Sequence, residues 1–88
     1  MKTDETKLIP REIMMVFNTI YTNGKSQDGG KFYQGLQATS SFDGYTLMIS
    51  NMETTVYLYF HNKLKLDSPN ARSKEDFYIK YRLILAEQ

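Results

Sequence analysis

The sequence predicts one α+β domain: a helix, a three-stranded antiparallel sheet and a second helix, with both helices on one face of the sheet. Three observations predict it, namely an amphipathic stripe near the N-terminus, alternating apolar residues in the middle, and a capped amphipathic segment near the C-terminus. A chain of 88 residues has room for one core. We therefore expect a single domain over residues 10–88, preceded by a flexible polar tail at residues 1–9.

The composition supports a modest core and excludes several kinds of chemistry. The apolar fraction is 41% and the aromatic fraction 14%, and 11 basic residues offset 10 acidic ones, so no global charge attracts nucleic acid or a membrane. The chain has no cysteine, which excludes disulfides and thiol chemistry. Residues 1–6 lack the apolar run of a secretory signal, and no later stretch could cross a membrane. We expect a cytoplasmic protein that does not contact membranes.

The first helix is predicted over residues 10–23. Its apolar side chains recur every three or four positions, at Ile13, Val16, Phe17, Ile20 and Tyr21. Pro10 suits the first helical turn because it has no N–H to leave unpaired. The following residues 25–31 contain no apolar side chain and are expected to form a mobile connection.

Alternation of apolar and polar residues predicts the sheet. The first strand is expected over residues 32–41, with Gly35 as a bulge or close approach. Asp43-Gly44 is typical of a tight hairpin turn and leads to a second strand over residues 45–50. After a reversal at residues 51–53, the third strand covers residues 54–61 and is rich in β-branched and aromatic side chains.

Two assignments stay open in the second half of the chain. Residues 62–67 either extend the third strand or form a short fourth strand. Residues 74–87 fit a helix opened by Ser73 and Asp76 as a capping box, although Lys80 and Arg82 also alternate with apolar residues as in a strand. We expect the helix, because the segment is long and capped.

The predicted core lies between the sheet and the two helices. On the sheet side it contains Leu36, Ala38, Leu47, Ile49, Val56, Leu58 and Phe60, and on the helix side Val16, Phe17, Ile20, Phe77, Tyr81 and Ile84.

The opposite face of the sheet is the surface most worth testing for function. It is predicted to expose Tyr33, Met48, Tyr57, Tyr59 and His61, followed by Lys63. These side chains suit packing across strands, a protein interface or homodimer, or, with Lys65, the stacking of bases beside neutralised phosphates. We expect an interaction or self-associating module, with a nucleic-acid-binding domain as the alternative.

No catalytic or metal site is expected. His61 is the single histidine, which excludes a multi-histidine metal site, and it is expected to be a surface residue. The pattern does not bring together any two of the carboxylates of Asp43, Glu53 and Asp67. We therefore expect neither an enzyme nor a cofactor.

Three short segments resemble those of a family of small uncharacterised proteins from gammaproteobacteria. They are residues 35–38 (GLQA), 42–46 (FDGYT) and 60–62 (FHN). The resemblance implies a bacterial cytoplasmic origin and carries over no catalytic residue. It points to Asp43, Gly44, Tyr45, His61 and Asn62 as positions to examine, where turn formation and hydrogen bonding at strand ends are the plainest roles.

Overall fold

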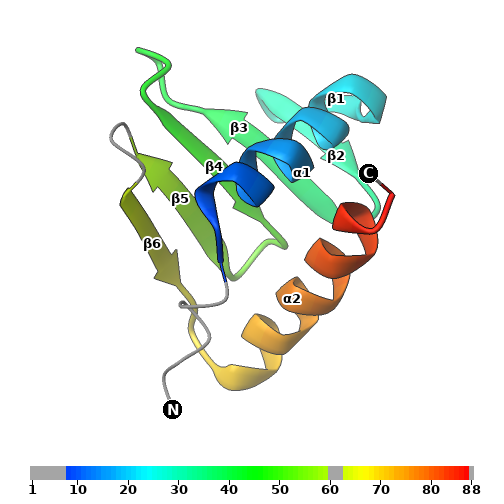
Figure 1. Ribbon diagram of the computed structural model, residues 1–88, viewed down its shortest axis with the longest axis vertical. Coiled ribbons are helices and arrows are strands. Elements are labelled where there is room, and N and C mark those ends of the chain that lie inside the picture. Colours follow the sequence, from blue (N-terminus) through cyan, green and yellow to red (C-terminus); the bar gives the residue numbers. More distant parts are fainter. Residues whose placement is uncertain (1–7, 60–62, 88) are drawn as a thin grey trace.

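The computed structural model describes residues 8–59 and 63–87, which form one antiparallel sheet and two helices (Figure 1). The helices are α1 (Pro10–Asn23) and α2 (Ala71–Leu85). The strands are β1 (Lys25–Gln27), β2 (Gly30–Tyr33), β3 (Leu36–Ser40), β4 (Thr46–Ser50), β5 (Thr55–Tyr59) and β6 (Lys63–Asp67). Their spatial order is the order of the chain, from β1 at one edge to β6 at the other.

The predicted three-stranded sheet is wrong, because the sheet has six strands. The expected mobile connection at residues 25–31 contains β1 and the turn that joins it to β2, and the expected strand over residues 32–41 is two strands. Residues 63–67, left open by the sequence, form the separate strand β6, which pairs with β5.

Two turns account for two of the three additional strands, β1 and β2. Asp28 and Gly29 have φ of 49° and 83°, and Gln34 and Gly35 have φ of 52° and 87°. Two successive residues with positive φ make the turn whose twist matches that of a hairpin. Gly35 is therefore a turn residue and not a bulge within a strand.

The turn at Gln34-Gly35 also decides which way Tyr33 points. Tyr33 pairs directly with Leu36, and directly paired residues point to the same face of an antiparallel sheet. Tyr33 consequently packs against the core with Leu36 instead of lying on the open face, where we predicted it. Its hydroxyl donates to a carboxylate oxygen of Glu87 at 2.9 Å.

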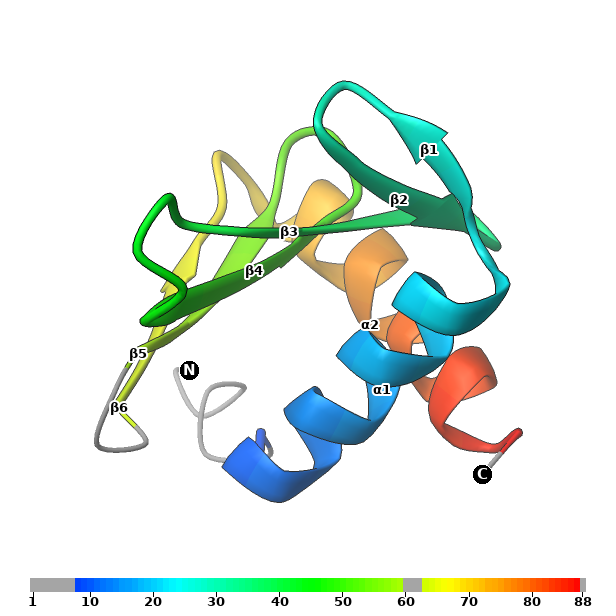
Figure 2. The same ribbon diagram turned by 90° about the horizontal axis from the view of Figure 1, so that it is seen from above.

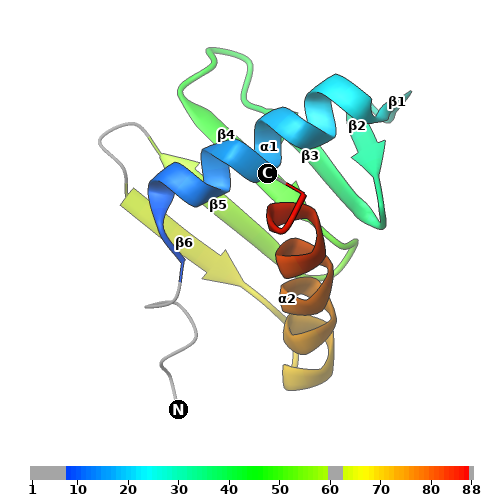
Figure 3. The same ribbon diagram turned by 45° about the vertical axis from the view of Figure 1, so that its right-hand side comes forward.

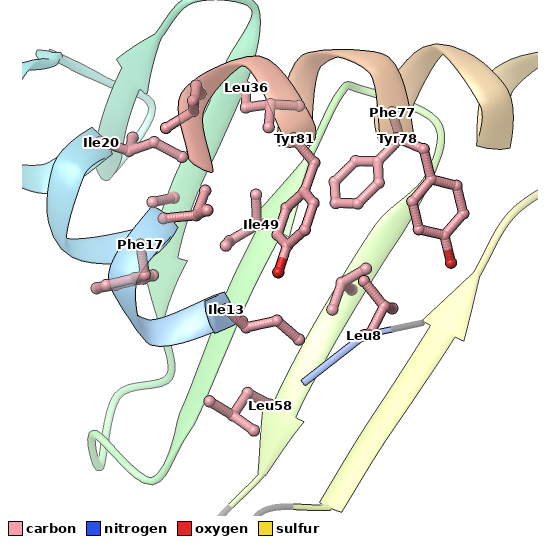
Figure 4. Packing of buried hydrophobic residues seen from close by; sticks show 14 residues of the cluster. Leu8, Ile13, Phe17, Ile20, Leu36, Ile49, Leu58, Phe77, Tyr78 and Tyr81 are labelled. Atoms are coloured by element: carbon pink, nitrogen blue, oxygen red, sulfur yellow. The ribbon is translucent and has the colours of Figure 1, made fainter. Parts of the chain in front are cut away.

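The sheet forms one layer and the helices form the other, as Figure 2 shows. Helix α1 contacts β2, β3 and β4, while α2 contacts β3 and α1. Figure 4 shows the buried side chains that fill the space between the layers. The predicted core is confirmed for its described members except Leu47, which is partly buried, and Phe60 lies outside the described residues. Leu8, Ile13 and Tyr78 are also buried, and the flexibility expected for residues 1–9 stays a prediction.

Helix α2 is confirmed as a helix, but it begins earlier than predicted. Its N-cap is Asn70, whose side-chain oxygen accepts from the Ser73 N–H at 2.8 Å. Ser73 therefore lies in the first turn, and its hydroxyl bonds to that of Thr54, just before β5.

Tyr81 places a polar hydroxyl inside the core. The side chain is 3% exposed, and its hydroxyl has no hydrogen-bond partner among the described residues. In Figure 4 the hydroxyl extends from α2 toward Ile13 of α1. Burial, followed by the charge of Glu12 and by Tyr78, raises the pKa of Tyr81 well above its usual range, so the hydroxyl stays neutral.

The Tyr81→Phe substitution is expected to leave stability unchanged or to raise it by up to about 1 kcal/mol, since it removes a buried hydroxyl without a partner. Phe77→Ala, one turn earlier in the same helix, should instead cost about 3 to 5 kcal/mol because Phe77 is fully buried. Urea unfolding followed by circular dichroism measures both. A loss of more than about 1 kcal/mol with Tyr81→Phe would show that the hydroxyl does have a partner.

Candidate functional site

The open face of the sheet brings together most of the predicted surface residues that the structure describes. Met48 pairs with Tyr57, and Tyr57 pairs with Lys65, so these three side chains form a row across β4, β5 and β6. Tyr59 lies in the next row, between Thr46 and Lys63. Of the other predicted residues, Tyr33 points to the core, and His61 and Asn62 lie outside the described residues.

The tyrosines of this face contact each other and a lysine. The rings of Tyr57 and Tyr59 are nearly parallel, at an interplanar angle of 5° with their centroids 5.9 Å apart. The Lys65 ammonium nitrogen lies 5.6 Å from the centroid of the Tyr57 ring, within the range of a cation–π interaction. Tyr57 therefore already contacts a ring and a cation within the sheet, and both tyrosines are only partly exposed.

The loop between β3 and β4 adjoins this face, because Thr46, which follows the loop, pairs with Tyr59. One oxygen of the Asp43 carboxylate accepts from the Ser41 hydroxyl at 2.6 Å and from the Tyr45 N–H at 3.0 Å. The Ser41 backbone N–H donates to the Thr46 carbonyl at 2.8 Å. These bonds across the loop fix its backbone.

The same bonds change the acidity of Asp43. The hydrogen bond from Ser41, followed by the one from the Tyr45 N–H, lowers the pKa of the Asp43 carboxyl below 3.8. Asp43 is thus a charged turn residue whose hydrogen bonds lie within the loop. The tight two-residue turn predicted at Asp43-Gly44 is a longer loop, since β3 ends at Ser40 and β4 begins at Thr46.

This loop exposes two aromatic side chains. Phe42 is fully exposed, at 109% of the reference area, and Tyr45 is 62% exposed. Phe42 did not stand out as a surface residue in the sequence, because a phenylalanine between two strands is more often part of the core. The sequence signal that could have identified Phe42 as exposed was its position in the turn segment. The apolar–polar alternation that turns strand residues toward the helices does not extend into a turn.

A second group of polar residues lies at the opposite end of β4 and β5. The Asn51 amide donates to an Asp76 carboxylate oxygen at 2.8 Å and to the Ser73 carbonyl at 3.1 Å. The side-chain oxygen of Asn51 accepts from the Thr54 N–H at 2.8 Å. The Thr54 hydroxyl, fully buried, lies 2.8 Å from the Ser68 hydroxyl and 2.7 Å from the Ser73 hydroxyl. We call this group the Asn51 network.

The Asn51 network borders an open pocket of about 620 Å³, which is lined by Asn51, Met52, Glu53, Asn70, Arg72, Ser73 and Asp76. Hydrogen bonds from Lys80 and then from Asn51 lower the pKa of Asp76 below 3.8, so this carboxylate is a poor proton acceptor. The Thr54 hydroxyl bonds to the hydroxyls of Ser73 and Ser68, and among the described residues neither Thr54 nor Ser73 has a side-chain hydrogen bond to a carboxylate. The network therefore connects the β4–β5 loop to α2.

The described residues hold no group of three or more His, Cys, Asp or Glu side chains placed to bind a metal ion. Within the same residues, neither helix is long and apolar enough to span a membrane.

The fold and this surface define a small α+β domain with an aromatic face and loop. The chain belongs to the family described as protein of unknown function (DUF3081), whose family model matches residues 8–88. Neither the curated proteins nor the solved structures contain a significant match to the chain. The resemblance to an uncharacterised family noted in the sequence agrees with this membership.

The carboxyl of Asp43 is expected to titrate below 3.8 in the folded protein, and Ser41→Ala should raise its pKa toward that value, because the Ser41 hydroxyl is the main cause of the shift. A carboxyl whose pKa is lowered by folding stabilises the fold above its unfolded pKa and loses this contribution as the pH falls. NMR titration of the side-chain carboxyl carbons measures the effect. Asp76 is the internal control, since its titration should not respond to Ser41→Ala.

Asn51→Ala is expected to destabilise the fold by about 1 to 3 kcal/mol, because it leaves several partly buried groups without their partner. Glu53→Ala, which removes an exposed side chain of the same loop, should change stability by less than about 0.5 kcal/mol. Thermal and urea unfolding of both variants check this difference. Equal effects of the two substitutions would contradict a stabilising role for the Asn51 network.

Proposed function

We propose that this protein is a non-enzymatic protein-interaction module that binds its partner with the loop between β3 and β4 and the adjoining open face of the sheet. We name the residues Phe42, Tyr45, Met48, Tyr57 and Tyr59 the aromatic surface. The observation that supports the proposal most is the full exposure of Phe42 on a loop fixed by hydrogen bonds.

The energetics of an exposed aromatic side chain favour this role. An exposed phenylalanine side chain contributes no burial free energy to folding, whereas its burial in a partner contributes roughly 1.5 to 3 kcal/mol to binding. The loop does not have to become ordered on binding, because Ser41 and Asp43 already fix its backbone. Preorganisation of this kind reduces the entropy cost of association. Phe42 is therefore suited to be an anchor residue of an interface.

The charges beside the tyrosines indicate the chemistry of the partner. Lys63 pairs with Tyr59, and Lys65 pairs with Tyr57, so each tyrosine has a lysine next to it on β6. Both lysines are exposed. A partner with an apolar pocket for Phe42 and carboxylates near its rim would complement this surface.

Nucleic acid is the second candidate named by the sequence, and it stays an alternative to be tested. Its support is the same pair of lysines beside two tyrosines. Against it, Tyr57 already packs against Tyr59 and Lys65, which leaves less of its ring for a base.

From the resemblance to the family, we also propose a gammaproteobacterial origin and a cytoplasmic location for the protein.

Affinity purification of the full chain from bacterial lysate, with and without Phe42→Ser, tests the proposed function. Loss of an anchor aromatic is expected to weaken binding about 30-fold or more, so a partner retained by the wild-type chain should be lost with this variant. Met52→Ser is the matched control, because Met52 is 91% exposed but lies in the β4–β5 loop.

The same experiment separates the alternatives. Two results would contradict the role of the aromatic surface. One is a partner that is lost equally with Phe42→Ser and Met52→Ser, and the other is a partner that both variants retain. Retention that disappears after nuclease treatment, together with oligonucleotide binding that weakens steeply with salt, would support nucleic acid instead.

A further inference from the structure

The outer edge of β6 is a second surface suited to an interaction. Strand β6 pairs with β5 and ends the sheet, and no described strand lies on its other side (Figure 3). An edge strand presents backbone N–H and C=O groups that another strand can pair with. The opposite edge strand, β1, has only exposed polar and charged side chains and no apolar residue to bury, so it is a poorer template.

The side chains of β6 alternate in a way that permits pairing. Lys63, Lys65 and Asp67 are exposed, whereas Leu64 and Leu66 are partly buried and pack against the core. The strand has no proline, and its charged side chains are not on the helix side. It thus lacks proline and inward-pointing charges, two of the features with which proteins commonly prevent pairing at a sheet edge, but it carries exposed lysines, which are a third. Both leucines would also lose exposed area if another strand covered the edge.

The charge pattern of β6 is complementary to itself in one antiparallel register. When two copies pair with Leu66 opposite Leu66, Lys65 of each copy lies opposite Asp67 of the other, and both charge pairs are favourable. When Lys65 lies opposite Lys65, Lys63 and Asp67 form two favourable pairs, but like charges meet at the centre of the interface. In both registers the leucines of the two copies share one face, as a continuous sheet requires.

We propose that a second copy of this chain pairs with the first along β6, in the antiparallel register centred on Leu66. The twofold axis is perpendicular to the sheet, so the six-stranded sheet continues into the second copy and the helices of both copies lie on the same side. The inference rests on the proposed interaction function and names one partner for it, but it uses an edge distinct from the Phe42 loop. Because only residues 65–67 of each strand lie opposite one another in this register, association is weak and depends on concentration.

Charge reversal in the full chain tests the proposal. Sedimentation velocity over a concentration series is expected to show a monomer–dimer equilibrium for the wild-type chain. Lys65→Glu and Asp67→Lys are each expected to raise the dissociation constant about tenfold or more, since each makes both cross-strand pairs repulsive. An equimolar mixture of the two variants should restore dimerisation, because the new carboxylate at position 65 then faces the new lysine at position 67. The restored mixture also shows that both variants are folded.

Two control variants locate the interface. Lys63→Glu should change the dissociation constant little, because residue 63 lies opposite Pro69 in this register, beyond the paired strand. Phe42→Ser should leave dimerisation intact, so that failure of the proposed function and failure of this inference are distinguishable.

A chain that stays monomeric at every concentration overturns the proposal. So does a mixture of the charge variants that associates no better than either variant alone. A loss with Lys63→Glu as large as that with Asp67→Lys overturns the register centred on Leu66, since that result requires Lys63 to face Asp67.

Discussion

In an antiparallel sheet, directly paired residues point to the same face, and this rule links all six strands of the domain. Leu36 is fully buried, and Ala38, two residues later in β3, points to the same face. Ala38 pairs with Ile49, Ile49 pairs with Val56, and Val56 pairs with Leu66, so all of these side chains share that face. The apolar side of every strand from β3 to β6 is thereby turned toward the helices. The same register aligns Met48, Tyr57 and Lys65 on the open face, so the core and the candidate surface have a common origin.

The two ends of the sheet are stabilised in different ways. At the end that contains the Asn51 network, side chains distant in the chain bond to one another, so that the β4–β5 loop and α2 stabilise each other. At the end that contains Phe42, the bonds are local to the loop and leave its aromatic side chains exposed. A contact surface at the second end can engage a partner without disturbing the polar bonds at the first.

Much of the fold could be predicted from the spacing of apolar residues, because buried positions recur with the period of a helix or of a strand. The stripe from Ile13 to Ile20 predicted α1 within its observed bounds, and alternation predicted β4 and β5. Strand β1 could not be predicted this way, since Lys25–Gln27 are all exposed and pair through backbone groups. Missing the turn at Gln34-Gly35 placed Tyr33 on the wrong face, because one unrecognised turn changes the parity of the residues before it. Asn51 and Ser73 meet only through tertiary structure, so local patterns do not associate them.

The linear order of the strands has a consequence for the path of folding. Each strand pairs with its neighbour in the chain, so the sheet can grow by successive hairpins, each of which closes a short loop at little entropic cost. The contact between α1 and α2 joins segments far apart in sequence and closes the longest loop. Docking of the second helix is therefore the step with the largest topological cost, and until it occurs the apolar side of the hairpins is only partly shielded from water.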